Sequence, residues 1–178
     1  MAETPDDELV GEVFAHFGLA AYLAQVLERS LATALSTTYG PGSTKVTQDE
    51  IDRRFEDLDE KSLDTLLNAL GKAGLPAGIM PAVRAALEDR NRLVHHFFWD
   101  RAIEFMSVDG CRRMIGDLVA MQQRFRECDA QVEAEVHQWA ASHGITTDDL
   151  GATHQAMLER GHVLTETEID EVLGARRR

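Results

Sequence analysis

The chain has 178 residues, 44% of them hydrophobic, and a formal net charge of −13 at pH 7. This length suits one domain with a real core, and the negative charge excludes a protein that coats duplex DNA, which needs a positive surface. No apolar run approaches the roughly 18 to 20 residues that span a bilayer, and the N-terminus is acidic, so neither a membrane helix nor a secretion signal is predicted.

Residue usage favours an all-α fold. Ala, Leu, Glu and Arg dominate, whereas the chain has only four prolines and 6% aromatic residues. Its two cysteines, Cys111 and Cys128, fall in one predicted helix, where they cannot pair with each other and are expected to be packing residues. Free cysteines without a secretion signal predict a cytoplasmic protein.

Three helices are predicted in the first half. The first covers about residues 7–36, with apolar residues at spacings of three and four: Val10, Phe14, Phe17, Ala21, Ala24, Leu27, Leu31 and Leu35. A Gly-Pro-Gly break follows at 40–42, and Thr47 and Glu50 then form a capping box that opens the second helix. A third, leucine-rich helix over 63–74 should end at the glycine and proline that follow it.

The second half is predicted to contain a fourth helix from Ile79 to Met106, with one buried face made of Val83, Leu87, Val94, Phe98 and Phe105, and Phe97 at its edge. A near-heptad series then predicts a long helix over 111–143, with Met114, Leu118, Met121, Phe125, Cys128, Val132, Val136 and Trp139. This long helix can pack across the bundle or extend as a coiled-coil-like arm, and so few heptads favour the bundle.

Two short helices should close the chain, one from Thr147 to near Gly161 and one after the capping box at Thr165 and Glu168. We therefore predict an antiparallel helical bundle over residues 1–145. A C-terminal helical extension over 146–178 should pack on the same domain.

The residues most capable of chemistry are Arg90, Asn91, His95 and His96, all within the predicted fourth helix. Asn91 and His95 are neighbours one turn apart, about 5–6 Å between Cβ atoms. Arginine binds phosphate through a planar, permanently charged fork, and histidine, with an unperturbed pKa of about 6.5, moves protons near neutral pH. Residues 84–126 also carry eight arginines against six acids, which leaves room for a local anion site in an acidic chain.

An ordinary helix surface is the alternative interpretation. Arg90 would then pair with Asp89 or Glu88, and the two histidines would only border the aromatic residues 97–99. Adjacent histidines should point to different faces of a helix, and no CxxC or HxxxH pair is present, so no metal site is expected. No glycine-rich loop follows a strand, so no cofactor is expected either.

Arg90, the Asn91 directly after it, and a histidine four residues further on at His95, or five at His96, together resemble the motif of the HEPN family. These are all-α domains whose ribonuclease members carry an arginine followed, after four to six residues, by a histidine. Residues 17–28 also look like the opening helix of some HEPN-like proteins. The resemblance covers about residues 8–140 and leaves open which of the two histidines is the motif residue.

The resemblance implies a metal-independent endoribonuclease whose site forms across a homodimer, as in toxins and phage-defence effectors, with a cognate antitoxin or regulatory protein as a further partner. A histidine would assist attack of the ribose 2′-hydroxyl on the adjacent phosphate, leaving a 2′,3′-cyclic phosphate. Arg90 would hold the phosphate, and Asn91 would fix the ribose or orient the imidazole. The second copy would supply the other acid or base.

Two alternatives stay open. One is a catalytically inactive HEPN-like module that binds a nucleotide or a partner protein in a defence or regulatory assembly. The other is a helical adaptor that binds its partner through the long helix over 111–143.

Overall fold

The computed structural model describes residues 3–37, 76–142 and 146–160, and residues 167, 168, 171, 172 and 174 near the C-terminus. Regular secondary structure in this part of the chain is entirely helical, which confirms the all-α fold class. The elements are α1 (Asp7–Thr37), α4 (Met80–His95), α5 (Phe97–Asp100), the 3-10 helix η1 (Glu104–Met106), α6 (Val108–Ser142) and α7 (Thr147–Arg160). The predicted second and third helices lie outside the described residues, as does most of the last one.

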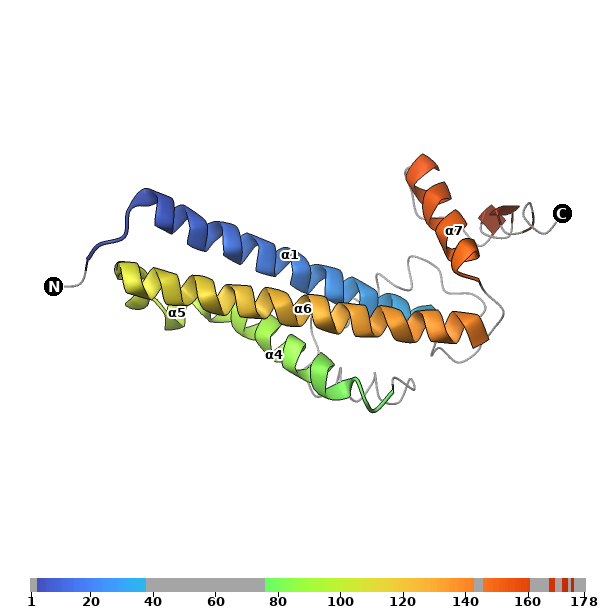
Figure 1. Ribbon diagram of the computed structural model, residues 1–178, viewed down its shortest axis with the longest axis horizontal. Coiled ribbons are helices and arrows are strands. Elements are labelled where there is room, and N and C mark those ends of the chain that lie inside the picture. Colours follow the sequence, from blue (N-terminus) through green and yellow to red (C-terminus); the bar gives the residue numbers. More distant parts are fainter. Residues whose placement is uncertain are drawn as a thin grey trace.

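α1, α4 and α6 form the helical bundle. Figure 1 shows α1 and α6 side by side and running in the same direction, with α4 running the opposite way. The contacts of α4 agree with this antiparallel arrangement, because Arg90 pairs with Glu28 while the Phe97 ring lies 5.9 Å from Phe17, nearer the start of α1. α7 begins at Thr147, as predicted, and projects away from the bundle in Figure 1. The division of the chain at residue 145 stays a prediction.

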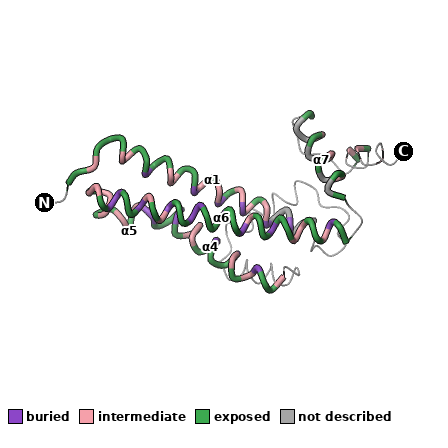
Figure 2. Tube along the Cα trace, in the orientation of Figure 1, coloured by how far each residue is buried: buried purple, intermediate pink, exposed green. Residues whose placement is uncertain are grey.

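The core lies where these three helices meet, and its buried residues form stripes on their facing sides (Figure 2). On α6 the near-heptad series is confirmed as far as Val132, since Met114, Leu118, Met121, Phe125, Cys128 and Val132 are buried, whereas Val136 and Trp139 are half-buried. α6 therefore packs along the bundle. On α1, Ala24, Leu27 and Leu31 are buried as predicted, but Phe14 is 53% exposed because Val13 takes the core position there.

The fourth helix is not continuous to Met106, contrary to prediction. α4 ends at His95, and His96 adopts a non-helical φ of −129° and ψ of −20° before α5 begins. Phe97 and Phe98, being neighbours, cannot both face the core from one straight helix. The break lets Phe97 enter the core, and Leu93 is buried with it, whereas Val94, predicted to be buried, is 54% exposed.

A cluster of five phenylalanines holds the segment after the break onto α1. Ring centroids of neighbouring members lie 4.9 to 5.9 Å apart, and the members are Phe14, Phe17, Phe97, Phe98 and Phe105. The Arg101 guanidinium lies 5.3 Å from the centre of the Phe97 ring and also pairs with Asp117 of α6. Aromatic and cation–π contacts of this kind add to the stability from burial alone. The chain just after His96 is therefore fixed against both long helices.

One stretch of α1, Asp7–Leu31, is long and apolar enough by length and composition to cross a membrane. The prediction that no such stretch exists was wrong because it considered only unbroken apolar runs. Glu12 is the sole charged residue between Leu9 and Val26, and the other polar residues there are scattered. One face of this helix packs in the core of the bundle. The cytoplasmic location stays a prediction.

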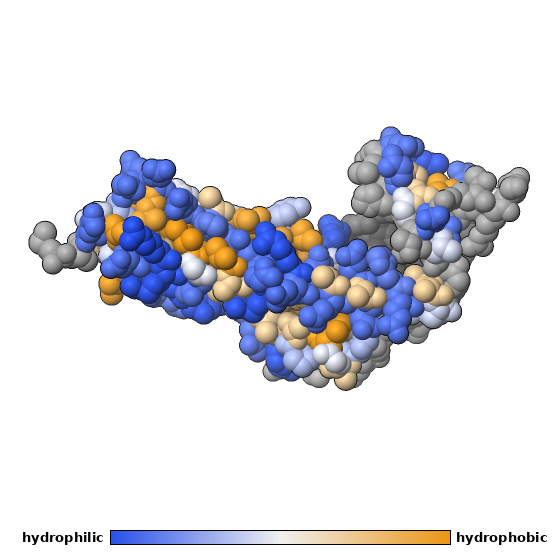
Figure 3. Space-filling model, in the orientation of Figure 1, coloured by the Kyte–Doolittle hydropathy of each residue, from blue (hydrophilic) through white to orange (hydrophobic). Residues whose placement is uncertain are grey.

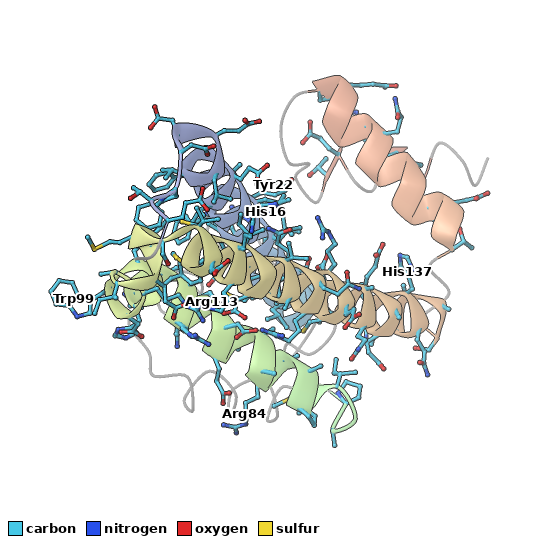
Figure 4. All side chains as sticks on the ribbon, turned by 60° about the vertical axis from the view of Figure 1, so that its left-hand side comes forward. His16, Tyr22, Arg84, Trp99, Arg113 and His137 are labelled. Carbon is cyan, nitrogen blue, oxygen red and sulfur yellow. The ribbon has the colours of Figure 1, made fainter. Side chains whose placement is uncertain are left out.

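A single polar side chain, Gln122 of α6, is fully buried within the described residues, and it explains the role of His16. The Gln122 amide nitrogen donates a 2.9 Å hydrogen bond to the His16 carbonyl oxygen and lies 3.2 Å from His16 Nδ1. Figure 4 shows His16 on α1 beside α6. A buried amide needs such partners, so this histidine helps to join the two helices.

Cys111 and Cys128 are buried free thiols, which confirms their predicted packing role. Burial raises the pKa of both thiols, and burial with the nearby Asp129 charge raises that of Cys128 to about 11, from an ordinary 9.0. Only the thiolate reacts with alkylating reagents, and its fraction falls tenfold for each unit by which the pKa rises. At pH 8 we therefore expect Cys128 to be alkylated at least about 100-fold more slowly in the native protein than in urea.

Mass spectrometry of the labelled Cys128 peptide measures this rate. The native rate should increase with pH up to about 11, where the thiol ionises in the folded state. Equal labelling rates for native and urea-unfolded protein would contradict the burial of this thiol.

Candidate functional site

Arg90 lies on the side of α4 that packs against α1. Its side chain is only 21% exposed and forms an ion pair with Glu28 of α1, which is 25% exposed. The suggested local pairing with Asp89 or Glu88 is therefore wrong for Asp89, whose carboxylate instead pairs with Arg124 of α6. Within one protomer, Arg90 joins two helices through a partly buried ion pair.

Asn91 is bound directly to Arg90. The guanidinium Nη1 donates a 3.1 Å hydrogen bond to Asn91 Oδ1. The amide nitrogen carries two further N–H donors, which can bind a phosphate or ribose oxygen. Two of the predicted site residues are thus brought together, and the ion pair with Glu28 fixes the arginine that holds the amide.

His95 and His96 are both exposed, with ring centroids 6.2 Å apart and ring planes 63° apart. The prediction that the two rings point to different helix faces assumed a continuous helix. Because His96 is the residue at which α4 ends, its side chain leaves the helical register. The two imidazoles therefore share one surface, at the C-terminal end of α4.

Arg92 is a neighbour of these histidines that the motif pattern did not single out. It is exposed, three positions before His95 and four before His96, and its carbonyl oxygen accepts a 3.0 Å hydrogen bond from the His96 backbone N–H. The position of Arg92 around the helix could have identified it from the sequence. At about 100° per residue, Arg92 lies opposite Val83 of the core, whereas Arg90 lies close to the core side.

Large apolar side chains are exposed just beyond the histidines. Trp99 and Ile103 are each 86% exposed and Met106 is 72% exposed. Figure 4 shows the Trp99 side chain pointing away from the bundle. A second apolar band runs along the visible face of α1 and α6 in Figure 3. Both helices have exposed large side chains, among them Tyr22 of α1, 61% exposed, and Val119 of α6, 45% exposed.

Within the described ranges, no group of three or more His, Cys, Asp or Glu side chains is placed to hold a metal ion. Comparisons with protein-family models, curated proteins and solved structures give no match. The candidate functional site is therefore the group of side chains at the end of α4.

Proposed function

We propose that this protein is a HEPN-like endoribonuclease that cleaves RNA without a metal ion. The observation that carries the proposal is the hydrogen-bonded Arg90 and Asn91 pair, held one turn before the two exposed imidazoles of His95 and His96. An arginine, an amide and imidazole are the groups that bind a phosphate and move a proton. The all-α fold agrees with this proposal.

In the proposed reaction, a histidine accepts the proton of the ribose 2′-hydroxyl, and the 2′-oxygen attacks the adjacent phosphorus. The bond to the 5′-oxygen breaks, leaving a 2′,3′-cyclic phosphate and a 5′-hydroxyl. The Asn91 amide donates to the ribose or the phosphate. Arg90 acts as a positioning residue that orients Asn91, because Glu28 already offsets part of its charge.

The cell role that we propose is a toxin or phage-defence effector, controlled by a cognate antitoxin or another regulatory protein. Such an effector acts on RNA in the cytoplasm. Its RNA target would be set by groups around the site, because base-specific contacts come from residues beyond the phosphate contacts.

We also propose that the protein forms a homodimer through Trp99, Ile103 and Met106. Burying one such side chain contributes about 1.5–3 kcal/mol to the free energy of association. Three of them within eight residues form an exposed apolar patch that a second copy would bury. We expect Ile103→Lys to shift the protein toward monomer, measured by sedimentation velocity. Val119→Lys on α6 is the control and should leave the dimer intact. A native protein that stays monomeric at high concentration would contradict the dimer.

A catalytically inactive module is the second candidate. Its specific support is the Arg90 and Glu28 ion pair, which places the motif arginine at a helix interface. This candidate predicts binding of single-stranded RNA without cleavage.

Cleavage of a mixed RNA pool in EDTA separates the two candidates. We expect the native protein to produce fragments with 2′,3′-cyclic phosphate ends, and His95→Ala to lower the rate by about 10²- to 10⁴-fold. Circular dichroism checks that the variant is folded. Equal cleavage by native protein, His95→Ala and His96→Ala would reveal a contaminant, and RNA binding without cleavage would support the inactive module.

A further inference from the structure

We propose that Arg92, His95 and His96 form a complete phosphodiester-cleaving site within one protomer. Arg92 binds the phosphate, and the two histidines act as base and acid. This assignment rests on the proposed ribonuclease function and deepens it. It differs from what the HEPN resemblance implies at two points: the arginine that contacts the phosphate, and the source of the second proton-transfer group.

Arg90 and Arg92 differ in how accessible they are to a phosphate. Arg90 is largely buried and pairs with Glu28 on α1, so a phosphate could reach its fork only by competing with a carboxylate. Arg92 is exposed and forms no ion pair among the described residues. A phosphate at the protein surface therefore meets Arg92 first.

The spacing of His95 and His96 suits a base and an acid on either side of one phosphate. In an in-line displacement, the attacking 2′-oxygen and the leaving 5′-oxygen lie on opposite sides of the phosphorus, so base and acid must be separated by the width of the phosphate. Two rings with centroids 6.2 Å apart on one surface can flank such a group. Arg92, one turn before both, lies on the same side of α4 as the two rings.

Protons balance within this site. One neutral imidazole takes the proton of the 2′-hydroxyl as the 2′-oxygen forms its bond to phosphorus. The other histidine, starting as imidazolium, gives its proton to the 5′-oxygen as that bond breaks. The protein ends with the two protonation states exchanged, and proton transfer with water restores them. Arg92 offsets the charge that develops on the phosphoryl oxygens.

The surroundings of the two histidines contain paired interface charges and an anchored turn. The interface charges that α1 and α6 turn toward α4 and its continuation are paired: Glu28 with Arg90, Arg124 with Asp89, and Asp117 with Arg101. Along the chain, the nearest acids outside these pairs are Glu88, four positions before Arg92, and Asp100, four after His96. The phenylalanine cluster anchors the residues that follow His96, so the imidazoles sit on a braced turn.

Steady-state cleavage of a 5′-labelled single-stranded RNA oligonucleotide in EDTA tests the assignment. We expect His95→Ala and His96→Ala each to lower kcat/KM by about 10²- to 10⁴-fold, and Arg92→Ala by about 10²-fold or more. Arg126→Ala, an exposed arginine on α6, is the matched control and should stay within about twofold of native, as surface changes away from a site do. The native pH profile should be bell-shaped, and each histidine variant should lose one limb.

Mixing the two histidine variants tests whether the pair acts within one protomer. If His95 and His96 act in the same chain, a refolded mixture of His95→Ala and His96→Ala contains no intact site and stays inactive. If they act across a two-fold axis, half of the dimers are mixed and each has one intact site, so activity returns to about a quarter of native.

Each remaining outcome has a distinct meaning. Near-native activity in Arg92→Ala or His96→Ala, with His95→Ala inactive, would overturn this assignment and leave the ribonuclease proposal standing. Recovery of activity in the mixture would overturn the one-protomer site. No cleavage by the native protein would overturn the ribonuclease proposal and this inference with it.

Discussion

Replacing Arg90 with alanine should lower the free energy of unfolding by about 1–3 kcal/mol, besides impairing RNA cleavage. The reason is the location of the pair, since the Arg90 and Glu28 side chains are only 21% and 25% exposed. Without the guanidinium, the Glu28 carboxylate loses its partner at the interface of α1 and α4, and Asn91 Oδ1 loses its donor. An unpaired charge in such a place is costly.

Urea unfolding of Glu28→Ala, Arg90→Ala and the double variant measures this coupling. We expect the double variant to lose less stability than the sum of the two single variants, by about 1 kcal/mol or more, because the pair is lost only once. Additive losses would contradict a working ion pair. Arg90→Lys separates stability from function: it keeps a charge beside Glu28 but loses the fork that also reaches Asn91. For this variant we expect near-native stability and a lower kcat.

Helices whose apolar residues recur over several turns could be predicted from the sequence. The all-α class and the extent of α6 follow from apolar spacing, and residues such as Met114, Phe125 and Val132 occupy the core as that spacing indicates. Over thirty-five residues, one misplaced side chain does not change the register of the whole helix.

The end of α4 could not be predicted in this way. Leu93, Val94, Phe97 and Phe98 offer more apolar residues than one straight helix face can bury, so the sequence is compatible with more than one register. Tertiary contacts decide between them, because the phenylalanines of α1 accept Phe98 only if the chain turns at His96. The four candidate residues could be named from the sequence, but their partners could not.

Arg90 illustrates the same limit. It lies in the core-facing stripe of α4, where an apolar residue would be expected, and nothing near it in the sequence identifies Glu28, 62 positions earlier, as its partner. An arginine within a buried stripe is a signal for an ion pair across helices, since burial of a charge requires a partner. The position of Arg90 in the stripe therefore predicts an acidic partner, but it does not predict which acidic residue that partner is.

Gly110→Ala should be among the most destabilising single-methyl changes in the protein, with a loss of about 3 kcal/mol. A Cβ at this position would lie 1.8 Å from the Glu104 carbonyl oxygen, where η1 crosses the first turn of α6. The Glu104 carbonyl carbon and Cα would also lie within 2.8 Å of this Cβ, and because all three atoms belong to the backbone, no side chain can rotate to make room. The same turn contains the helix cap, in which the Gly110 N–H donates to Ser107 Oγ at 3.2 Å and the Ser107 N–H donates to the Glu104 carbonyl oxygen. Relief of the clash must therefore break the cap as well.

Gly116→Ala is the control, because it makes the same change in the same helix. Gly116 is exposed and a Cβ there meets nothing within 4 Å, so the substitution should stabilise the protein by about 0.5–1 kcal/mol through better helix propensity. Urea unfolding of both variants gives the comparison, and equal stabilities would show that η1 does not lie against α6.

Because η1 is continuous with the segment that Phe98 and Phe105 anchor on α1, Gly110→Ala should also loosen the turn at His96. A loss of RNA cleavage under conditions where the variant is still folded would link this close backbone contact to the site.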